Sequence, residues 1–161
     1  MRVKEAMTPD PITCRVTDTI SSVGARMRSN QIGGLPVMDG EKIAGMVTET
    51  DLLKLLTTPG PSVDLWLPSP FEVIELPIRE LMNWERTKEA LSDIGSREVR
   101  TIMTSPVITI RPDEDIETAA SLMLSRKIDR LAVVDGNTLT GIITRQDIVW
   151  AISGTGKRGE T

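Results

Sequence analysis

Two short stretches of this sequence carry residue types that could bind a ligand. Each has a glycine, two apolar residues, a threonine and then an aspartate three residues later, reading GMVTETD from Gly45 and GIITRQD from Gly141. A threonine followed three residues later by an acid is a common helix start, because both side chains bond free amide groups of the first turn. The pairs Thr48–Asp51 and Thr144–Asp147 can therefore be explained as helix caps alone.

The same pairs could instead bind a nucleotide. Free amide groups at a helix N-terminus attract anions, and a threonine hydroxyl there can add a hydrogen bond to a phosphate. The aspartate would repel that phosphate, but its carboxylate can accept hydrogen bonds from the hydroxyls of a ribose. This interpretation places phosphate on Thr48 or Thr144, ribose on Asp51 or Asp147, and the base in an apolar slot.

Few residues of this sequence could support catalysis or bind a metal ion. The sequence has no histidine and one cysteine, Cys14, which excludes the usual zinc and haem sites and an intrachain disulfide. An enzyme needs a general base, nucleophile or metal in place, so we expect neither an enzyme nor a metal site. Cys14 lies in a predicted strand and is expected to be a small buried side chain. The tryptophans are expected in the core or in subunit contacts, not against a ligand (Trp66, Trp84 and Trp150).

Charge and hydropathy limit the partners. The net charge is −4 over 161 residues, and no segment is strongly basic, so a nucleic-acid partner is not supported. The N-terminus lacks the apolar core of a signal peptide, and no apolar run is long enough to span a membrane. We therefore expect a cytoplasmic protein with no membrane contact.

An internal duplication positions both motifs. Shifted by 96 residues, Val3–Leu53 aligns with Val99–Val149 without a gap, and 17 of the 51 positions are identical. Identity on this scale, with every motif in the same order, indicates a repeat. The chain is therefore divided into a first repeat (1–56), a Pro-rich and helical inter-repeat segment (57–98), a second repeat (99–153) and a flexible tail (154–161).

Each repeat predicts the same order of elements, βαββα. A short apolar strand is followed by an acidic or hydroxylic cap and a helix, whose core positions are Ile20, Val23 and Met27, and Ile116, Ala119 and Met123. Two strands then flank an Asp-Gly pair, a strong hairpin signal because both residues tolerate positive φ. The predicted strands are Pro11–Cys14, Leu35–Met38 and Lys42–Val47, and Val107–Ile110, Leu131–Val134 and Leu139–Ile143. Such a small unit cannot be stable alone, so the sheets of the two repeats should pack together.

Between the repeats, the sequence predicts one helix over Ile78–Ile94, closed by Gly95 as the residue after its C-cap. The residues before it are rich in proline and cannot form a continuous helix.

The ordered motifs resemble a tandem pair of CBS domains, known as a Bateman module. The resemblance rests on MT-x-x-x-I-T, then L-x-V-x-D-G, then G-φ-φ-T-x-x-D, all present twice, and covers about 102 of the 161 residues. It implies an α/β (α+β) fold of two units packed about a pseudo-twofold axis with two clefts between them. It also implies binding of adenosine-containing ligands such as AMP, ADP, ATP or S-adenosylmethionine, with no catalysis and no required cofactor.

The resemblance also implies which residues line each cleft. The Thr–Asp pair of one repeat should face the positions before the second strand of the other. One cleft would combine Thr48 and Asp51 with Ala119, Ile128, Asp129 and Arg130; the other would combine Thr144 and Asp147 with Val23, Ile32, Gly33 and Gly34. Arg130 matches a position that often meets phosphate in related modules. Glu49 and Asp129 would add negative charge to the first of these clefts, and Arg145 could serve the second.

The expected function is a regulatory nucleotide sensor that forms a homodimer and modulates an unidentified partner protein. The alternative is a structural dimerisation or interaction module with vacant clefts. Related modules also occur inside inosine monophosphate dehydrogenase, but this chain has no room for the catalytic barrel of that enzyme, which needs about 250 residues.

Overall fold

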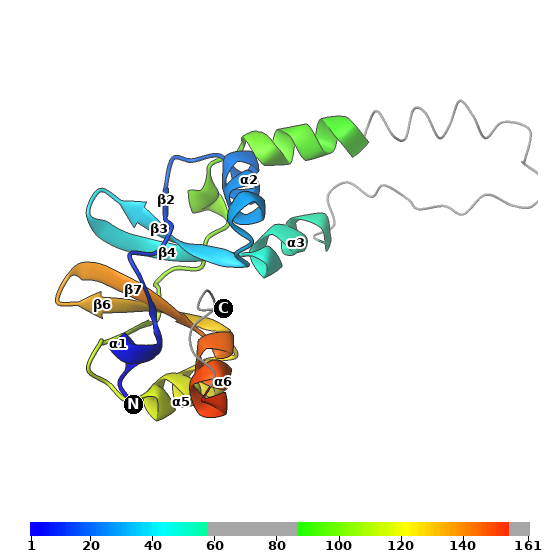
Figure 1. Ribbon diagram of the computed structural model, residues 1–161. Helices are drawn as coiled ribbons and strands as arrows, with labels where there is room; N and C mark the ends of the chain where they lie inside the picture. Colours follow the sequence, from blue (N-terminus) through cyan, green and yellow to red (C-terminus); the bar gives the residue numbers. More distant parts are fainter. Residues whose placement is uncertain (58–86, 155–161) are drawn as a thin grey trace, which may run out of the picture.

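The computed structural model describes residues 1–57 and 87–154. Two units with the same element order lie one above the other (Figure 1). The first unit contains β2 (Cys14–Arg15), α2 (Ile20–Asn30), β3 (Gly34–Asp39), β4 (Lys42–Thr48) and α3 (Glu49–Thr57). The second contains β5 (Thr109–Ile110), α5 (Ile116–Arg126), β6 (Arg130–Asp135), β7 (Thr138–Thr144) and α6 (Arg145–Ser153). The predicted βαββα order and the α+β class are confirmed.

The first strand of each repeat is shorter than predicted. Only two residues pair in each case, with Cys14 opposite Val37 and Thr109 opposite Ala132, both in parallel. The stretch from Pro11 is apolar but does not pair with β3, so the predicted strand over Pro11–Cys14 begins at Cys14 instead. The predicted strand over Val107–Ile110 is likewise reduced to Thr109–Ile110.

The hairpin prediction is confirmed, but its turn lies one residue later than expected. Asp39 is still paired with Lys42, so the turn residues are Gly40 and Glu41. Gly40 has φ 60°, and the equivalent Gly136 has the same value, whereas neither Asp39 nor Asp135 has positive φ. A two-residue hairpin turn with glycine in its first position needs positive φ only there.

The predicted closure of the inter-repeat helix at Gly95 is wrong. Residues 87–96 are helical, and Gly95 lies inside this helix without the positive φ of a C′ glycine. A Cβ on Gly95 would lie 3.3 Å from Ser21 Cβ, so the glycine permits close packing on α2. The rest of the predicted helix, residues 78–86, lies outside the described residues.

The two sheets repeat the same register. One has the order β2-β3-β4, and the other β1-β7-β6-β5, where β1 (Thr8–Pro9) is an added edge strand. The β3–β4 pairing runs from Gly34 opposite Thr48, and the β6–β7 pairing from Arg130 opposite Thr144. Both hairpins have an irregularity at the same aligned position. The repeat in sequence is thus a repeat in backbone geometry.

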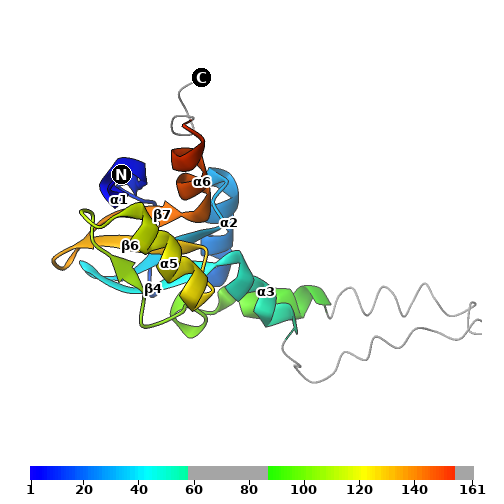
Figure 2. The ribbon, with the colours of Figure 1, turned by 90° about the horizontal axis from the view of Figure 1, so that it is seen from below.

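The repeats exchange their N-terminal segments. Val3, in helix α1 (Val3–Ala6), is fully buried in the core of the second unit, and its amide donates to Glu114 O. Conversely, Val99, in the 3-10 turn η1 (Val99–Thr101), is fully buried in the core of the first unit. Figures 1 and 2 both show α1 beside α5 and β7, away from its own repeat. The contiguous repeats are therefore not the packing units, and the exchange ties them together.

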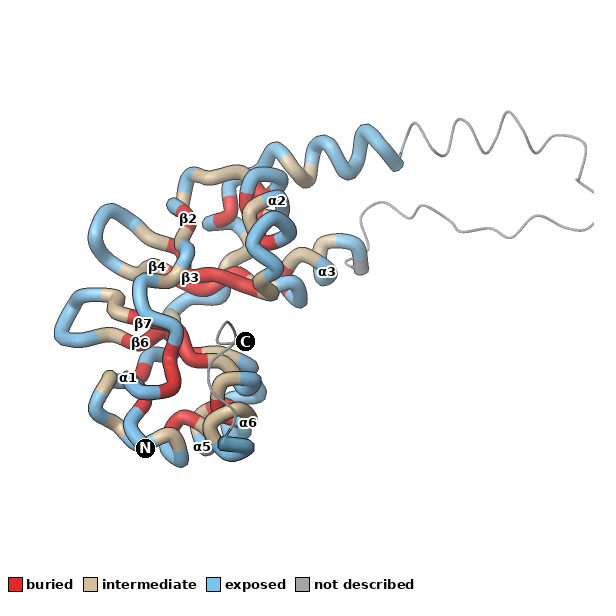
Figure 3. Tube along the Cα trace, viewed as in Figure 1, coloured by how far each residue is buried: buried red, intermediate tan, exposed pale blue. Residues whose placement is uncertain are grey.

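A small apolar layer joins the two sheets. Met46, Ala132 and Ile142 are buried together, with Ile43, Val107, Val134 and Leu139 packed against them. Figure 3 shows the buried residues concentrated along the central strands, while the outer faces of the helices are exposed. This packing brings the β4–α3 and β7–α6 junctions, which carry the two Thr–Asp pairs, to the boundary between the units.

Candidate functional site

Thr144 and Asp147 form a complete helix cap. Thr144 is the N-cap of α6; its amide and its hydroxyl each donate to Asp147 Oδ2, at 2.7 Å and 2.7 Å. In return the Asp147 amide donates to Thr144 Oγ1 at 3.3 Å. This reciprocal arrangement is the capping box that the spacing predicts.

Thr48 and Asp51 repeat two of these three hydrogen bonds at the start of α3. The amide and hydroxyl of Thr48 donate to Asp51 Oδ2 at 2.9 and 3.1 Å. Asp51 is the one charged residue in the described chain that is counted among the buried residues, with 8% exposure. In both pairs the Oδ1 atom lies outside the cap, so a ligand hydroxyl could bond it without breaking the helix start.

The helix N-termini themselves offer less to an anion than the sequence suggests. The first amide of α3, Glu49 N, donates to Gly33 O at 3.0 Å. The first amide of α6, Arg145 N, donates to Asp129 O at 2.9 Å. Each threonine hydroxyl already donates to its aspartate. Each junction therefore offers a phosphate fewer donors than a helix N-terminus with all its amides free.

One cavity of about 370 Å³ lies at the Thr48–Asp51 pair and is called the Thr48 cleft here. It brings together five of the residues predicted for that cleft, which come from both repeats: Thr48, Asp51, Ile128, Asp129 and Arg130. Its apolar wall comes from Met46, Val107 and Ile108. The volume falls within the range of small-molecule sites.

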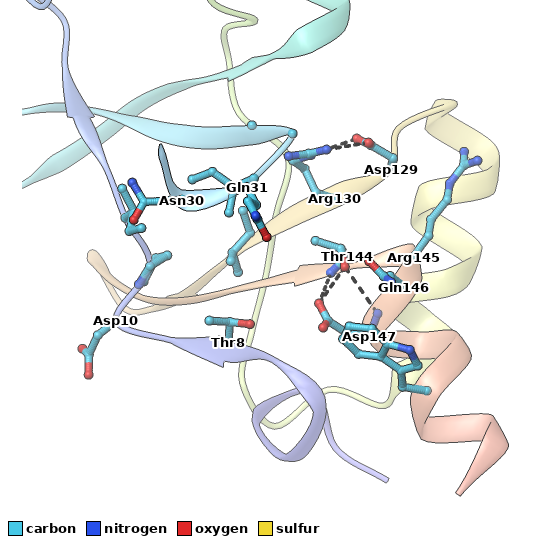
Figure 4. Close-up of a pocket in the computed structure, with 17 residues that line it drawn as sticks. Thr8, Asp10, Asn30, Gln31, Asp129, Arg130, Thr144, Arg145, Gln146 and Asp147 are labelled. Atoms are coloured by element: carbon cyan, nitrogen blue, oxygen red, sulfur yellow. Dashed lines mark hydrogen bonds and ion pairs between the residues drawn. The ribbon is translucent and has the colours of Figure 1, made fainter. Parts of the chain in front are cut away.

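A second cavity of about 700 Å³ lies at the Thr144–Asp147 pair and is called the Thr144 cleft. Five of its predicted residues also line it, again from both repeats: Thr144, Asp147, Ile32, Gly33 and Gly34. Figure 4 shows the Thr144–Asp147 hydrogen bonds on one side of this cavity and Asn30 and Gln31 on the other.

Two predicted site residues lie elsewhere. Ala119 and Val23 are both fully buried, and each belongs to the core beneath the helix of its own unit. They occupy the inward face of α5 and α2, so neither lines a cleft. Glu49, expected in the Thr48 cleft, instead lies beside Gly33 in a third cavity, which α2 and α3 line.

Arg130 lines the cleft predicted for it and, in addition, the Thr144 cleft. Its side chain is only 11% exposed and makes a two-point contact with Asp129, Nη2 to Oδ2 at 2.7 Å and Nε to Oδ1 at 3.0 Å. These hydrogen bonds are the main reason why the pKa of the Asp129 carboxyl is lowered from its ordinary value. The guanidinium is therefore held in place by a charge-assisted pair.

The guanidinium of Arg130 lies against its aligned counterpart, Gly34, where the lack of a side chain leaves room for it. A Cβ on Gly34 would lie 2.5 Å from Arg130 Nη1 and 2.7 Å from Val47 O, and one on Gly33 would lie 3.1 Å from Arg130 Nη2. The duplicated position thus holds an arginine in one repeat and the space for that arginine in the other.

Several cleft residues were not predicted from the sequence. Thr8, Asp10, Pro11 and Ile12 reach the Thr144 cleft because the N-terminal segment crosses to the second unit. Lys54 and Lys127 line the Thr48 cleft, and Trp150, expected in the core or a subunit contact, lines the Thr144 cleft. Each of these residues has a copy 96 residues away that lines the other cleft, but no copy of a predicted site residue falls on any of them. Trp66 and Trp84 lie outside the described residues.

Other expectations concern metals, membranes and the cysteine. Within residues 1–57 and 87–154 no cluster of three or more His, Cys, Asp or Glu is arranged to hold a metal ion. None of the helices in that part of the chain has the length and hydropathy needed to cross a bilayer. Cys14 is 2% exposed, as expected, and burial is the main cause that raises the pKa of its thiol to about 11.

Comparison with known proteins gives one consistent family. The model of the CBS domain matches residues 3–58 and 99–154. The chain is 37% identical to protein MJ1426 of Methanocaldococcus jannaschii, over 94% of this chain and 91% of that protein. It is also 31% identical to inosine-5′-monophosphate dehydrogenase of Mycobacterium leprae, over 92% of this chain but only 22% of the enzyme.

Solved structures agree with this assignment of the fold. The structure of CBSX2 in complex with AMP has a TM-score of 0.67 at 24% identity, covering 95% of this chain and 96% of that one. The CBS domain pair of protein MJ0100, in complex with 5′-methylthioadenosine and S-adenosyl-L-methionine, has a TM-score of 0.70 at 23% identity, covering 96% and 97%.

Proposed function

This chain belongs to the CBS domain family, and from that premise we propose that it is a regulatory module that binds adenosine-containing ligands and acts on a separate protein. The observation that carries the proposal is the composition of the two clefts. Each joins a Thr–Asp pair from one repeat to the segment before the second strand of the other. A ligand in either cleft would contact both units and could report its presence through their relative position.

The ligand class follows from the groups that face each cleft. The Oδ1 atoms of Asp51 and Asp147 can accept ribose hydroxyls while Oδ2 keeps its cap hydrogen bonds. Arg130 supplies a positive charge for phosphate, and apolar walls suit a purine base. AMP, ADP, ATP and S-adenosylmethionine combine these features, and the neighbouring structures named above contain AMP, 5′-methylthioadenosine or S-adenosylmethionine. We propose no catalytic role and no required cofactor.

A structural module with vacant clefts is the second candidate. It is favoured by the cap hydrogen bonds, since the hydroxyl of each threonine and one oxygen of each aspartate are already used within the helix start. The two candidates differ in a single measurable property, which is affinity for adenosine ligands.

Titration calorimetry of wild type and Arg130→Ala with adenosine and AMP tests how the proposed sensor recognises phosphate. Wild type should bind both ligands. Because a guanidinium can make a charge-assisted contact with phosphate, the substitution should weaken AMP by about tenfold, near 1.4 kcal/mol, and leave adenosine nearly unchanged. An equal loss of affinity for both ligands would mean that Arg130 supports the shape of the clefts and does not bind phosphate.

We also propose that the protein is a homodimer. The outer faces of α3 and α6 expose large apolar residues, with Leu53 and Leu56 each 61% exposed, Val149 60% and Ile152 76%. A closed twofold dimer is the commonest way to cover such faces. Light scattering should give twice the chain mass of 17.7 kDa at micromolar concentration; a mass of one chain would contradict the proposal.

A further inference from the structure

The two clefts differ in charge, although they arose from the same sequence. They share three charged residues, Asp129, Arg130 and Arg145, which line both. A residue common to both walls can favour one cleft only through the direction in which its side chain is held. The other source of selectivity is the set of residues that the clefts do not share.

The residues that are not shared make the Thr48 cleft positive. Among the described residues that line it, four are cationic and two anionic, namely Lys54, Lys127, Arg130 and Arg145, and Asp51 and Asp129. Arg145 also donates through Nε and Nη2 to Ile128 O, at 3.2 and 3.1 Å, and Ile128 lines only this cleft. The guanidinium of Arg145 is thus held at the edge of the Thr48 cleft.

The Thr144 cleft has the opposite balance. Of the described residues in its wall, only the two shared arginines are cationic, while Asp10, Asp129 and Asp147 are anionic. Figure 4 shows Arg145 extending away from the Thr144–Asp147 pair, and Asp10 at the rim with its carboxylate turned outward. Its other polar side chains are uncharged, including Asn30, Gln31 and Gln146.

Alignment of the repeats shows which substitutions created this difference. Lys127 aligns with Gln31, and each has left-handed φ (55° and 53°) after the last turn of its helix. Lys54 aligns with Trp150. At both positions the Thr48 cleft has a lysine where the Thr144 cleft has an uncharged side chain. The backbone is equivalent at Gln31 and Lys127, so the difference there is one of side-chain charge.

We propose that the two clefts divide adenosine ligands by charge: the Thr48 cleft selects ligands that carry phosphate, and the Thr144 cleft takes ligands without phosphate. A phosphate in the Thr48 cleft meets lysines in addition to the arginines. Among the described residues of the Thr144 cleft it meets the same two arginines but no lysine. The neutral amides there suit hydroxyl and thioether groups, and Trp150 offers an aromatic face to a base. This division rests on the proposed function.

The aligned pair provides the decisive substitution. Lys127→Gln introduces glutamine, the residue type of the aligned Gln31. Since Gln31 has the same backbone conformation in the first repeat, little strain is expected. AMP affinity should fall by about threefold to tenfold, with adenosine unchanged. Arg126→Gln is the matched control, because Arg126 is the exposed neighbour, carries the same charge and lines neither cleft. The control should leave both affinities unchanged.

The reverse substitution, Gln31→Lys, tests the Thr144 cleft. In the Asp51→Ala background, where the Thr48 cleft has lost its ribose partner, the remaining adenosine binding should belong to the Thr144 cleft. Adding Gln31→Lys in that background should raise AMP affinity by a similar factor without changing adenosine. Asp147→Ala alone should leave the tight binding of AMP intact.

The outcomes separate this inference from the function on which it rests. If tight AMP binding depends on Asp147 and not on Asp51, or if Lys127→Gln weakens AMP and adenosine equally, the division by charge is wrong while ligand binding stands. If neither AMP nor adenosine binds the wild type, the proposed function fails and the division fails with it.

Discussion

Replacing Asp51 or Asp147 by alanine should weaken adenosine binding at the affected cleft by about 1.5 to 3 kcal/mol, or roughly tenfold to a hundredfold. This is expected because a ribose hydroxyl loses a charged acceptor at the Oδ1 atom that the cap does not use. Adenosine itself should be affected, since the lost contact is to ribose. Titration calorimetry of each variant, and of the double variant, measures the effect.

The same substitutions also remove a cap acid, so stability must be followed alongside affinity. Loss of such a cap contact should lower the free energy of unfolding by about 0.5 to 2 kcal/mol. Glu5→Ala is the matched control, because Glu5 Oε2 accepts a hydrogen bond from the Arg2 amide in the capping box of α1 and lines neither cleft. It should cost stability and leave affinity unchanged. If the aspartate variants behave like this control, the Thr–Asp motif is only a helix cap.

Gly45→Ala and Gly141→Ala should each destabilise the fold by about 1 to 3 kcal/mol, as overpacking does in a tight interior. A Cβ on Gly45 would lie 2.8 Å from both Met103 Sδ and Thr104 O. A Cβ on Gly141 would lie 2.5 Å from Met7 Sδ and 3.0 Å from Thr8 O. Each glycine thus accepts the exchanged N-terminal segment of the other repeat, and the backbone carbonyls cannot move as a flexible methionine can.

Urea unfolding of these variants measures how much stability is lost when the packing of the exchanged N-terminal segments is disturbed. Gly24→Ala is the control, since a Cβ there meets nothing within 4 Å and alanine is the better helix former. It should stabilise the protein by up to about 1 kcal/mol. Unchanged stability in Gly45→Ala and Gly141→Ala would show that the exchanged segments do not hold the units together.

Local features of the fold could be predicted from the sequence because their causes are local. The hairpins follow from Gly40 and Gly136, where positive φ is needed in the turn. The helix starts at Thr48 and Thr144 follow from side chains that bond amides three residues away or less. The turn centre was misplaced by one residue because an Asp-Gly pair fits two neighbouring hairpin positions.

Features that depend on how the repeats meet could not be predicted in this way. Val3 and Val99 lie in short N-terminal segments of the repeats. Nothing in the sequence of these segments indicates which unit will bury them. The position of Arg130 between two clefts depends on the missing side chain of Gly34 in the other unit. The resemblance predicts Val23 and Ala119 in the clefts, whereas their helical periodicity predicts them in the core, where the structure places them.

Thermal unfolding in the presence of adenosine, AMP, ATP and S-adenosylmethionine tests the central claim most directly. A ligand that binds only the folded state should add roughly 2.7 kcal/mol to the free energy of unfolding when its concentration is about a hundred times its dissociation constant. For a chain of this size that shift corresponds to a rise in Tm of several degrees. We expect such a rise with at least one of the four ligands. If all four, at millimolar concentration, leave the Tm unchanged, the chain is not an adenosine sensor.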